Sequence, residues 1–301
     1  MPSSLPHLDY AVLTDVGRKR LANEDAVAAD ARTGLFVVCD GVGGRPSGEA
    51  ASQIVSHATP HALRRGLRGL RGLRGRKQLD EDTLKRLLVD ASVAMNQQMY
   101  QHSQAVPALV GMGCTMVAAL LDARTVFYLH AGDSRLYLLR ESKLTPLTAD
   151  HTHTRQKFNT EPDTGDLLDM GERRLLMQYI GSPRTLEPTV ASLPLRKGDR
   201  LLLCSDGLTD PLRDATLHEL LTQHAEPEAA ARALVDAAND AGGPDNITVA
   251  VIDYRGARPV TAADRVPPSP TPQELPHGIA RRMCDALAQL EENLTWLKQG
   301  A

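Results

Sequence analysis

Short apolar runs separated by turn residues constrain the fold of this 301-residue chain more than any other feature. Runs of this length that are rich in valine, leucine and tyrosine are typical of β-strands. Some are separated by only a few turn-forming residues, such as Asp122-Ala123-Arg124, which favours antiparallel sheet. The runs are YAVLT (10–14), LFVVC (35–39), MVAALL (116–121), VFYLH (126–130), RLYLL (135–139), RLLLC (200–204) and ITVAVI (247–252).

Helical periodicity predicts helices over residues 48–63, 80–104, 214–223 and 226–240. Clusters of strands are therefore flanked by pairs of helices, and the strict βαβ alternation of a parallel sheet is absent. We expect one α+β layered domain over residues 1–254. Residues 255–272 contain five prolines and no apolar periodicity, which is typical of a solvated linker.

The C-terminal residues 273–301 are predicted to form a separate amphipathic helix. Its apolar residues follow alternating steps of three and four, as in a coiled-coil seam: Ala280, Met283, Leu287, Leu290, Leu294 and Leu297. So short a seam needs a surface to cover it. Two alternatives stay open, namely packing against the first domain, or association through residues 273–298 with a second copy or another protein.

A Leu-Arg-Gly triplet occurs three times in succession over residues 67–75. Because a three-residue period matches neither an amphipathic helix nor a strand, residues 64–78 are expected to form a mobile basic loop between two helices. Two interpretations stay open: a solvated insertion without a role, or a docking element for an acidic or phosphorylated partner.

Overall charge and composition narrow the class of protein. The net charge of −3 and a hydrophobic content of 42% indicate a globular chain and no general affinity for nucleic acid or membranes. The N-terminal residues lack the pattern of a signal peptide. The four cysteines are far apart in the sequence, which implies neither a disulfide framework nor a zinc cluster. We therefore expect a cytoplasmic protein.

Four aspartates stand at the ends of apolar runs: Asp40, Asp133, Asp206 and Asp245. One such residue is usually a turn former or helix cap, but four of them suggest a metal site made of oxygen ligands. Mg²⁺ and Mn²⁺ prefer such ligands, whereas Ca²⁺ needs a richer cage. The pair His151 and His153 is an alternative ligand set, although its spacing on a polar segment is more typical of an exposed loop.

Two further segments carry groups suited to phosphate chemistry. Asp40 is followed by Gly41 in the sequence DGVGG, where glycines let the backbone approach an ion or a phosphate. Near the N-terminus, Arg20 is followed closely by Glu24 and Asp25. Arginine can hold a phosphate through two hydrogen bonds, but a surface salt bridge would explain this segment equally well.

Taken together, these segments resemble the bacterial-type, metal-dependent serine/threonine protein phosphatases of type 2C. The resemblance covers residues 10–254 in the order expected. It rests on TDVGRKRLANEDA (14–26), VVCDGVGG (37–44), GCTMVAALL (113–121), HAGDSRLY (130–137), LLCSDGLTD (202–210) and GGPDNITVAVI (242–252).

The resemblance implies a four-layer αββα sandwich of two antiparallel sheets flanked by helix pairs. It also implies residue roles. Asp40 would bridge two Mn²⁺ or Mg²⁺ ions, the Gly41 carbonyl would bind one of them, and Asp206 with Asp245 would hold the other. Asp133, with Asp206, would hold a third, weaker ion. Glu24 and Asp25 would order water around the ions, and Arg20 would bind the phosphate.

The resemblance further implies hydrolysis of phosphoserine and phosphothreonine by a metal-bound water, on proteins phosphorylated by a cognate serine/threonine kinase. Many eukaryotic relatives have a histidine where this chain has Val42, so the proton donor for the leaving group is left open. Residues 145–187 correspond to a variable flap expected to influence substrate choice. Two alternatives stay open: a catalytically weak signalling scaffold, and a phosphatase of small phosphate esters.

Overall fold

The computed structural model describes residues 4–31, 33–42, 47–74, 79–105, 107–155 and 173–259. These residues form two antiparallel sheets packed face to face. The first has the order β1 (Ser4–Asp15), β13 (Ile247–Pro259), β12 (Arg200–Cys204), β7 (Arg135–Arg140) and β8 (Lys143–Pro146). The second has the order β11 (Thr189–Pro194), β6 (Thr125–Ala131), β5 (Met116–Asp122), β3 (Leu35–Val42) and β2 (Asp25–Asp30), and the short β4 (Gly113–Cys114) also pairs with β3.

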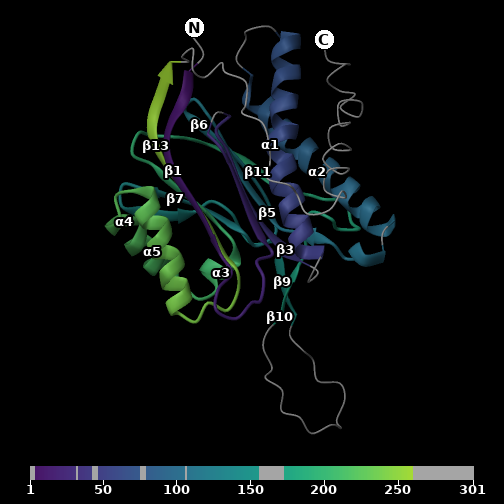
Figure 1. Ribbon diagram of the computed structural model, residues 1–301. Helices are drawn as coiled ribbons and strands as arrows, with labels where there is room; N and C mark the ends of the chain where they lie inside the picture. The colour runs from purple at the N-terminus through teal and green to yellow at the C-terminus, as the bar shows by residue number, and fades with distance from the viewer. Residues whose placement is uncertain are drawn as a thin grey trace.

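Helices cover the outer face of each sheet (Figure 1). The long helices α1 (Ser47–Arg74) and α2 (Glu81–Ala105) lie on the second sheet, followed by a short 3-10 turn at Pro107–Leu109. On the first sheet lie α3 (Asp206–Thr209), α4 (Asp214–Gln223) and α5 (Pro227–Asp240). The predicted four-layer αββα architecture is thus confirmed. Among the described helices, none has the length and apolar character needed to cross a bilayer.

Strand β3 shows why its sheet is covered on both faces, by helices on one face and by the other sheet on the opposite face. Leu35, Val37 and Cys39 point into the core beneath α1 and α2, whereas Phe36 and Val38 point into the core between the sheets. Successive side chains of a strand point to opposite faces. A strand that is apolar at every position therefore has to be covered on both sides.

Helix α1 is longer than the sequence predicted, and the expectation of a loop beginning at residue 64 was wrong. The helix continues to Arg74 because Leu63 and Leu67 are buried in the core shared with α2. At Gly66 a side chain would collide with Leu87 of α2, so this glycine lets the two helices approach closely. Residues 75–78 lie outside the described residues.

Strand β13 runs five residues beyond the predicted domain end at Tyr254. It continues to Pro259 because its last residues pair with the start of β1, with Pro259 opposite Ser4. The predicted linker therefore begins later than residue 255. Its remaining residues and the C-terminal segment 273–301 lie outside the described residues.

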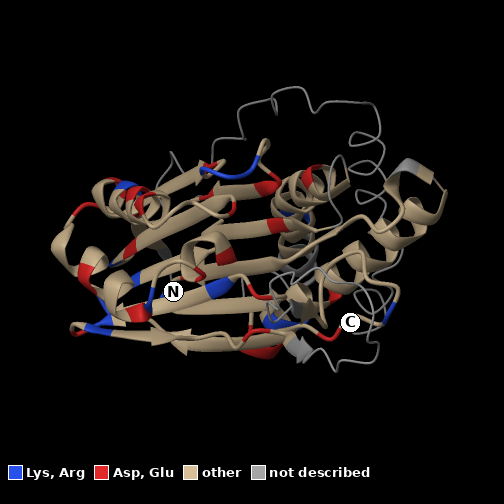
Figure 2. Cartoon of the chain, turned by 90° about the horizontal axis from the view of Figure 1, so that it is seen from below, with Lys and Arg blue, Asp and Glu red and all other residues tan. Residues whose placement is uncertain are grey.

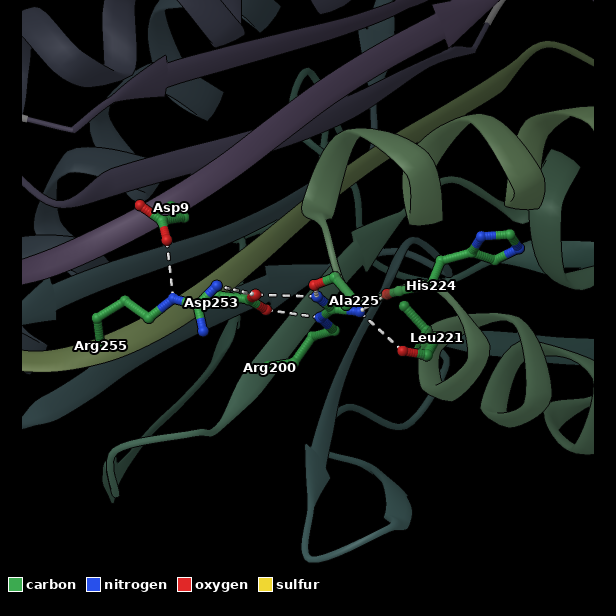
Figure 3. A network of polar contacts seen from close by, with 7 residues as sticks. All are labelled: Asp9, Arg200, Leu221, His224, Ala225, Asp253 and Arg255. Carbon is green, nitrogen blue, oxygen red and sulfur yellow. Dashed lines mark hydrogen bonds and ion pairs between the residues drawn. The ribbon is translucent and has the colours of Figure 1, made fainter.

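A buried arginine joins α4 to the first sheet (Figure 3). Arg200 donates two hydrogen bonds to Asp253, with its Nε 2.6 Å from Oδ1 and its Nη2 2.9 Å from Oδ2. It also donates to the carbonyl oxygens of Leu221, His224 and Ala225 at the end of α4. Carbonyls at a helix end have no partner within the helix. The Arg200 side chain therefore supplies hydrogen-bond donors both to these carbonyls and to the buried carboxylate of Asp253.

Candidate metal-dependent active site

Asp25 and Asp40 lie directly opposite each other on the neighbouring strands β2 and β3. Asp25 is 7% exposed, and its Oδ2 accepts a hydrogen bond of 2.7 Å from the Ser205 hydroxyl. Its Oδ1 is buried and has no hydrogen-bond partner among the described residues. The sequence did not predict β2, whose residues DAVAAD lack a strong apolar pattern.

The proximity of these carboxylates makes each of them harder to ionise. Burial raises the pKa of Asp25 to about 7, with repulsion from Asp206 and Asp245 adding to the effect. Burial, repulsion from Asp25 and Asp206, and a hydrogen bond with Asp206 raise the pKa of Asp40 well above its usual range. A bound cation would offset this repulsion, so the electrostatics of the site favour a cation.

Asp206 and Asp245 reach the same place from the first sheet. Asp206 is the first residue of α3, directly after β12, and Asp245 lies just before β13. A side chain at Gly207 would collide with the backbone carbonyl of Asn246. A glycine is therefore needed at residue 207 for the start of α3 to lie this close to Asp245.

Arg20 forms an ion pair with Asp245, with its Nη2 2.6 Å from Oδ2. Partial burial lowers the pKa of Arg20, but the carboxylates of Asp245, Glu24 and Asp40 outweigh that effect and raise it. The expected phosphate-binding arginine is therefore at the site, but its guanidinium contacts an expected metal ligand. Asp245 would have to share or release Arg20 in order to bind a cation.

Asn246 positions the loop that carries Arg20 and Glu24, and sequence reasoning missed it. Its Oδ1 accepts from the Glu24 backbone N–H at 2.8 Å. Its Nδ2 donates to the carbonyls of Val16 and Ala22 at 2.9 and 2.8 Å. The available signal was its place directly after Asp245, because side-chain amides often hold loops through backbone hydrogen bonds.

Gly41 lies where the backbone of three segments converges. Its N–H donates to the Glu24 carbonyl at 3.1 Å, and a side chain here would collide with the backbone of Gly48 in α1. A side chain at Gly48 would in turn collide with the Glu24 carboxylate. Both glycines thus make room for the backbone and for Glu24, and Gly48 was not predicted.

Asp133 extends the acidic group along the site. It is 8% exposed, and burial together with repulsion from Asp206 raises its pKa to about 7. Thr115 links the neighbouring Ser134 to Asp40: the Thr115 hydroxyl accepts from the Asp40 backbone N–H at 3.0 Å and lies 2.6 Å from the Ser134 hydroxyl. Asp133 and Asp206 interact electrostatically, and their role as ligands of a third ion stays a prediction.

The alternative histidine ligand set is not favoured. His151 stacks on His130, with ring centroids 4.3 Å apart, and its Nε2 lies 3.0 Å from the Thr189 hydroxyl. Burial lowers the pKa of His151. The side chain of His153 lies outside the described residues. His151 is therefore a packed residue at the base of the flap.

The residues present fit a divalent metal of the Mg²⁺ or Mn²⁺ type. The donors are carboxylate and carbonyl oxygens, and one buried carboxylate oxygen of Asp25 lacks a partner among the described residues. In the described part of the chain, no three histidine, cysteine or carboxylate side chains form a preassembled metal cage. An ion held here would complete its shell with water, as Mg²⁺ usually does. Figure 2 shows acidic positions (red) over the strands at the centre of the molecule.

Known proteins are similar to this chain in both sequence and fold. The profile of the protein phosphatase 2C family matches residues 17–238. The serine/threonine protein phosphatase PstP of Mycobacterium tuberculosis is 37% identical over 266 residues, which cover 85% of this chain and 48% of PstP. The chain thus spans about half the length of this relative. Protein phosphatase PhpP of Streptococcus pneumoniae is 30% identical, over 81% of this chain and 97% of PhpP.

Solved structures of related proteins have a similar fold. The catalytic domain of PstP in complex with two manganese ions has a TM-score of 0.63 at 35% identity, covering 82% of this chain and 97% of that one. PppA, a regulatory component of the type VI secretion system in Pseudomonas aeruginosa, has a TM-score of 0.66 at 29% identity, covering 83% and 99%. By sequence and by fold, this chain belongs to the protein phosphatase 2C family.

Proposed function

We propose that this protein hydrolyses phosphoserine and phosphothreonine on other proteins in a reaction that depends on Mn²⁺ or Mg²⁺. The observation that carries the proposal is the convergence of Asp25, Asp40, Asp206 and Asp245 from both sheets, with carboxylate pKa values raised by burial and repulsion. Membership of the protein phosphatase 2C family and the manganese ions bound by PstP support it.

Each residue has a role in this proposal. Asp40, the Gly41 carbonyl, Asp206 and Asp245 would hold two ions, with Asp40 shared between them. When bound, the ions activate a water for attack on phosphorus and offset the phosphate charge. Arg20 holds the phosphoryl oxygens through its planar fork of donors.

Other residues orient these groups. Glu24 and Asp25 order the surrounding water. Asn246 accepts a hydrogen bond from the Glu24 backbone N–H, and the Ser205 hydroxyl donates one to Asp25, so both residues are held in place. Asp133 and Asp206 would hold a third ion.

The wider setting is also part of the proposal. The substrates are proteins phosphorylated by a cognate serine/threonine kinase, and the location is cytoplasmic. Cys39, Cys114 and Cys204 are buried free thiols, as expected for a reducing compartment. A Pro-rich linker and a C-terminal helix that packs on the domain or binds a partner complete the proposed organisation.

The test is Mn²⁺-dependent release of phosphate from a phosphothreonine peptide by the wild-type protein and by Asp40→Asn and Asp206→Asn. Asp236→Asn is the matched control, because Asp236 is exposed on α5. We expect loss of activity in the first two variants and unchanged activity in the control. Equal rates in all four proteins would exclude the mechanism. Hydrolysis of small esters without hydrolysis of peptides would favour the small-ester alternative.

A further inference from the structure

Exposed apolar side chains gather on two segments that border the acidic group. Leu21 is 98% exposed and follows Arg20 directly, and Val16 on the same loop is 37% exposed. On the flap, Leu175 and Met177 are 44% and 42% exposed. Single exposed apolar residues are common on protein surfaces. Two such pairs beside one charged site are suited to bind a ligand that has both charged and apolar groups.

The loop that carries Leu21 is held in place by hydrogen bonds. Asn246 donates to the carbonyls of Val16 and Ala22, on either side of Leu21. The backbone N–H groups of Arg18 and Lys19 donate to the Gly243 carbonyl. The backbone at Leu21 is therefore held next to Arg20, and almost no protein atoms cover the Leu21 side chain.

The flap residues are fastened to the other end of the acidic group. The Met177 backbone N–H donates to the His151 carbonyl at 2.8 Å, and the His151 N–H donates to the Gly132 carbonyl at 2.9 Å. Gly132 directly precedes Asp133. Leu175 lies on β10 (Arg173–Leu176), which pairs with β9 (Thr152–Arg155), and this hairpin projects from the lower end of the sandwich in Figure 1.

A chain of hydrogen bonds places the two apolar pairs at different ends of the site. Arg20 contacts Asp245 at 2.6 Å. Asn246, next to Asp245, accepts from the Glu24 N–H, and the Glu24 carbonyl accepts from the N–H of Gly41, next to Asp40. The Thr115 hydroxyl accepts from the Asp40 N–H and lies 2.6 Å from the hydroxyl of Ser134, next to Asp133. The order across the site is therefore Leu21 and Arg20, then Asp245, then Asp40, then Asp133 and the flap.

From this order we infer that the protein selects phosphorylated segments with apolar side chains on both sides of the phosphoresidue. Leu21 and Val16, at the end marked by Arg20, contact one flank. Leu175 and Met177, at the end marked by Asp133, contact the other, where the unbranched Met177 adapts to side chains of different shape. We call these four residues the apolar rim. The inference rests on the proposed function, because it assumes that the phosphate occupies the acidic site.

The apolar rim predicts a difference between substrates. A small aryl phosphate reaches the arginine and the metal site but not the rim, whereas a peptide contacts both. Apolar contacts made along the peptide should therefore raise kcat/KM mainly by lowering KM, because they bind the ground state and the transition state alike.

The test uses the Mn²⁺-loaded full chain and three substrates. Two are phosphothreonine peptides that differ only in having leucine or serine on both sides of the phosphothreonine, and the third is p-nitrophenyl phosphate. The variants are Leu21→Ser and the double variant Leu175→Ser with Met177→Ser. The control is Val12→Thr, at a valine that is 38% exposed on β1 outside the rim.

We expect wild type to prefer the leucine-flanked peptide by about tenfold in kcat/KM, and each rim variant to lose about 3- to 10-fold on that peptide alone. Absence of the preference in wild type, or equal losses on all three substrates, would overturn the inference. Wild-type protein inactive on every substrate would instead refute the proposed function. Peptide binding measured by fluorescence anisotropy would then test the apolar rim separately from activity. Equal affinity for the leucine-flanked and serine-flanked peptides would overturn the inference.

Discussion

Arg20 and Asp245 form a 2.6 Å ion pair at the proposed metal site. Both side chains remain partly exposed, at 52% and 31%, so the pair is held less tightly than a buried one. The Asp245 carboxylate therefore has two competing partners, namely Arg20 and the proposed cation. Arg20 in turn would bind phosphate. Cation binding at Asp245 would weaken its hold on Arg20 and free the guanidinium for substrate.

The first prediction concerns Arg20→Ala. We expect kcat/KM on a phosphothreonine peptide to fall about 10²- to 10³-fold, because a donor aimed at the phosphoryl oxygens is lost. Binding of Mn²⁺, measured by calorimetry, should be unchanged or tighter, because Asp245 loses a competing partner. Arg232→Ala, at an exposed arginine of α5, should change neither quantity. Weaker Mn²⁺ binding with unchanged kcat/KM would contradict these roles.

The second prediction concerns the stability of the metal-free protein. Burial raises the pKa of Asp25 to about 7, whereas an unfolded aspartate titrates near 4. The folded protein therefore binds this proton more tightly than the unfolded chain does. The contribution of Asp25 to the free energy of unfolding should be greatest below about pH 4 and should decline, by an amount on the order of 2–4 kcal/mol, as pH rises through about 7.

Urea unfolding in EDTA between pH 4 and pH 8 measures this decline. The free energy of unfolding of wild type minus that of Asp25→Asn should fall as pH rises over this range, and Asp236→Asn on α5 should leave the wild-type profile unchanged. Saturating Mn²⁺ should stabilise the wild-type protein most at the high end of the range, because the ionised carboxylates bind it best. A difference between wild type and Asp25→Asn that does not fall between pH 4 and pH 8 in EDTA would show that burial does not raise the pKa of Asp25.

The third prediction concerns the buried ion pair of Arg200 and Asp253. Arg200→Ala should lower the free energy of unfolding by about 3–5 kcal/mol, because the loss of one partner of a buried pair leaves the other charge poorly compensated. The carbonyls of Leu221 and His224 also lose their donor. Activity of the folded variant at low temperature should not change. Arg232→Ala, which breaks an exposed pair with Glu228, should cost no more than about 0.5 kcal/mol.

The fourth prediction concerns the end of the domain. A chain that ends at Tyr254 should be less stable than one that ends at Pro259 by about 1–3 kcal/mol, because several strand hydrogen bonds between β13 and β1 are lost. The ion pair between Arg255 and Asp9 is lost as well. Urea unfolding of the two chains provides the measurement. Equal stability would indicate that the last residues of β13 add nothing to the sheet.

Much of the fold followed from local patterns in the sequence. The apolar runs at residues 35–39 and 200–204 lie within strands because their residue types favour extended backbone. The aspartates at the ends of these runs were identified as candidates because a strand end holds a side chain rigidly while leaving it accessible.

Other features depended on contacts between distant segments. The pairing of β2 with β3 sets Asp25 against Asp40, and neither the weak pattern of DAVAAD nor any local signal indicated that register. Helix α1 extends to Arg74 despite three glycines in its last turns, because the burial of Leu63 and Leu67 against α2 outweighs the low helix propensity of glycine.

The sequence by itself therefore determined the residue types available for the site and the segments that could carry them. Only the tertiary structure decided which groups meet. Ser205 reaches Asp25 and Asn246 reaches Glu24 across separations of 180 and 222 residues. Such pairings depend on how the two sheets pack. The raised pKa values of Asp25 and Asp40 follow from the same packing, because burial and mutual repulsion exist only when the chain is folded.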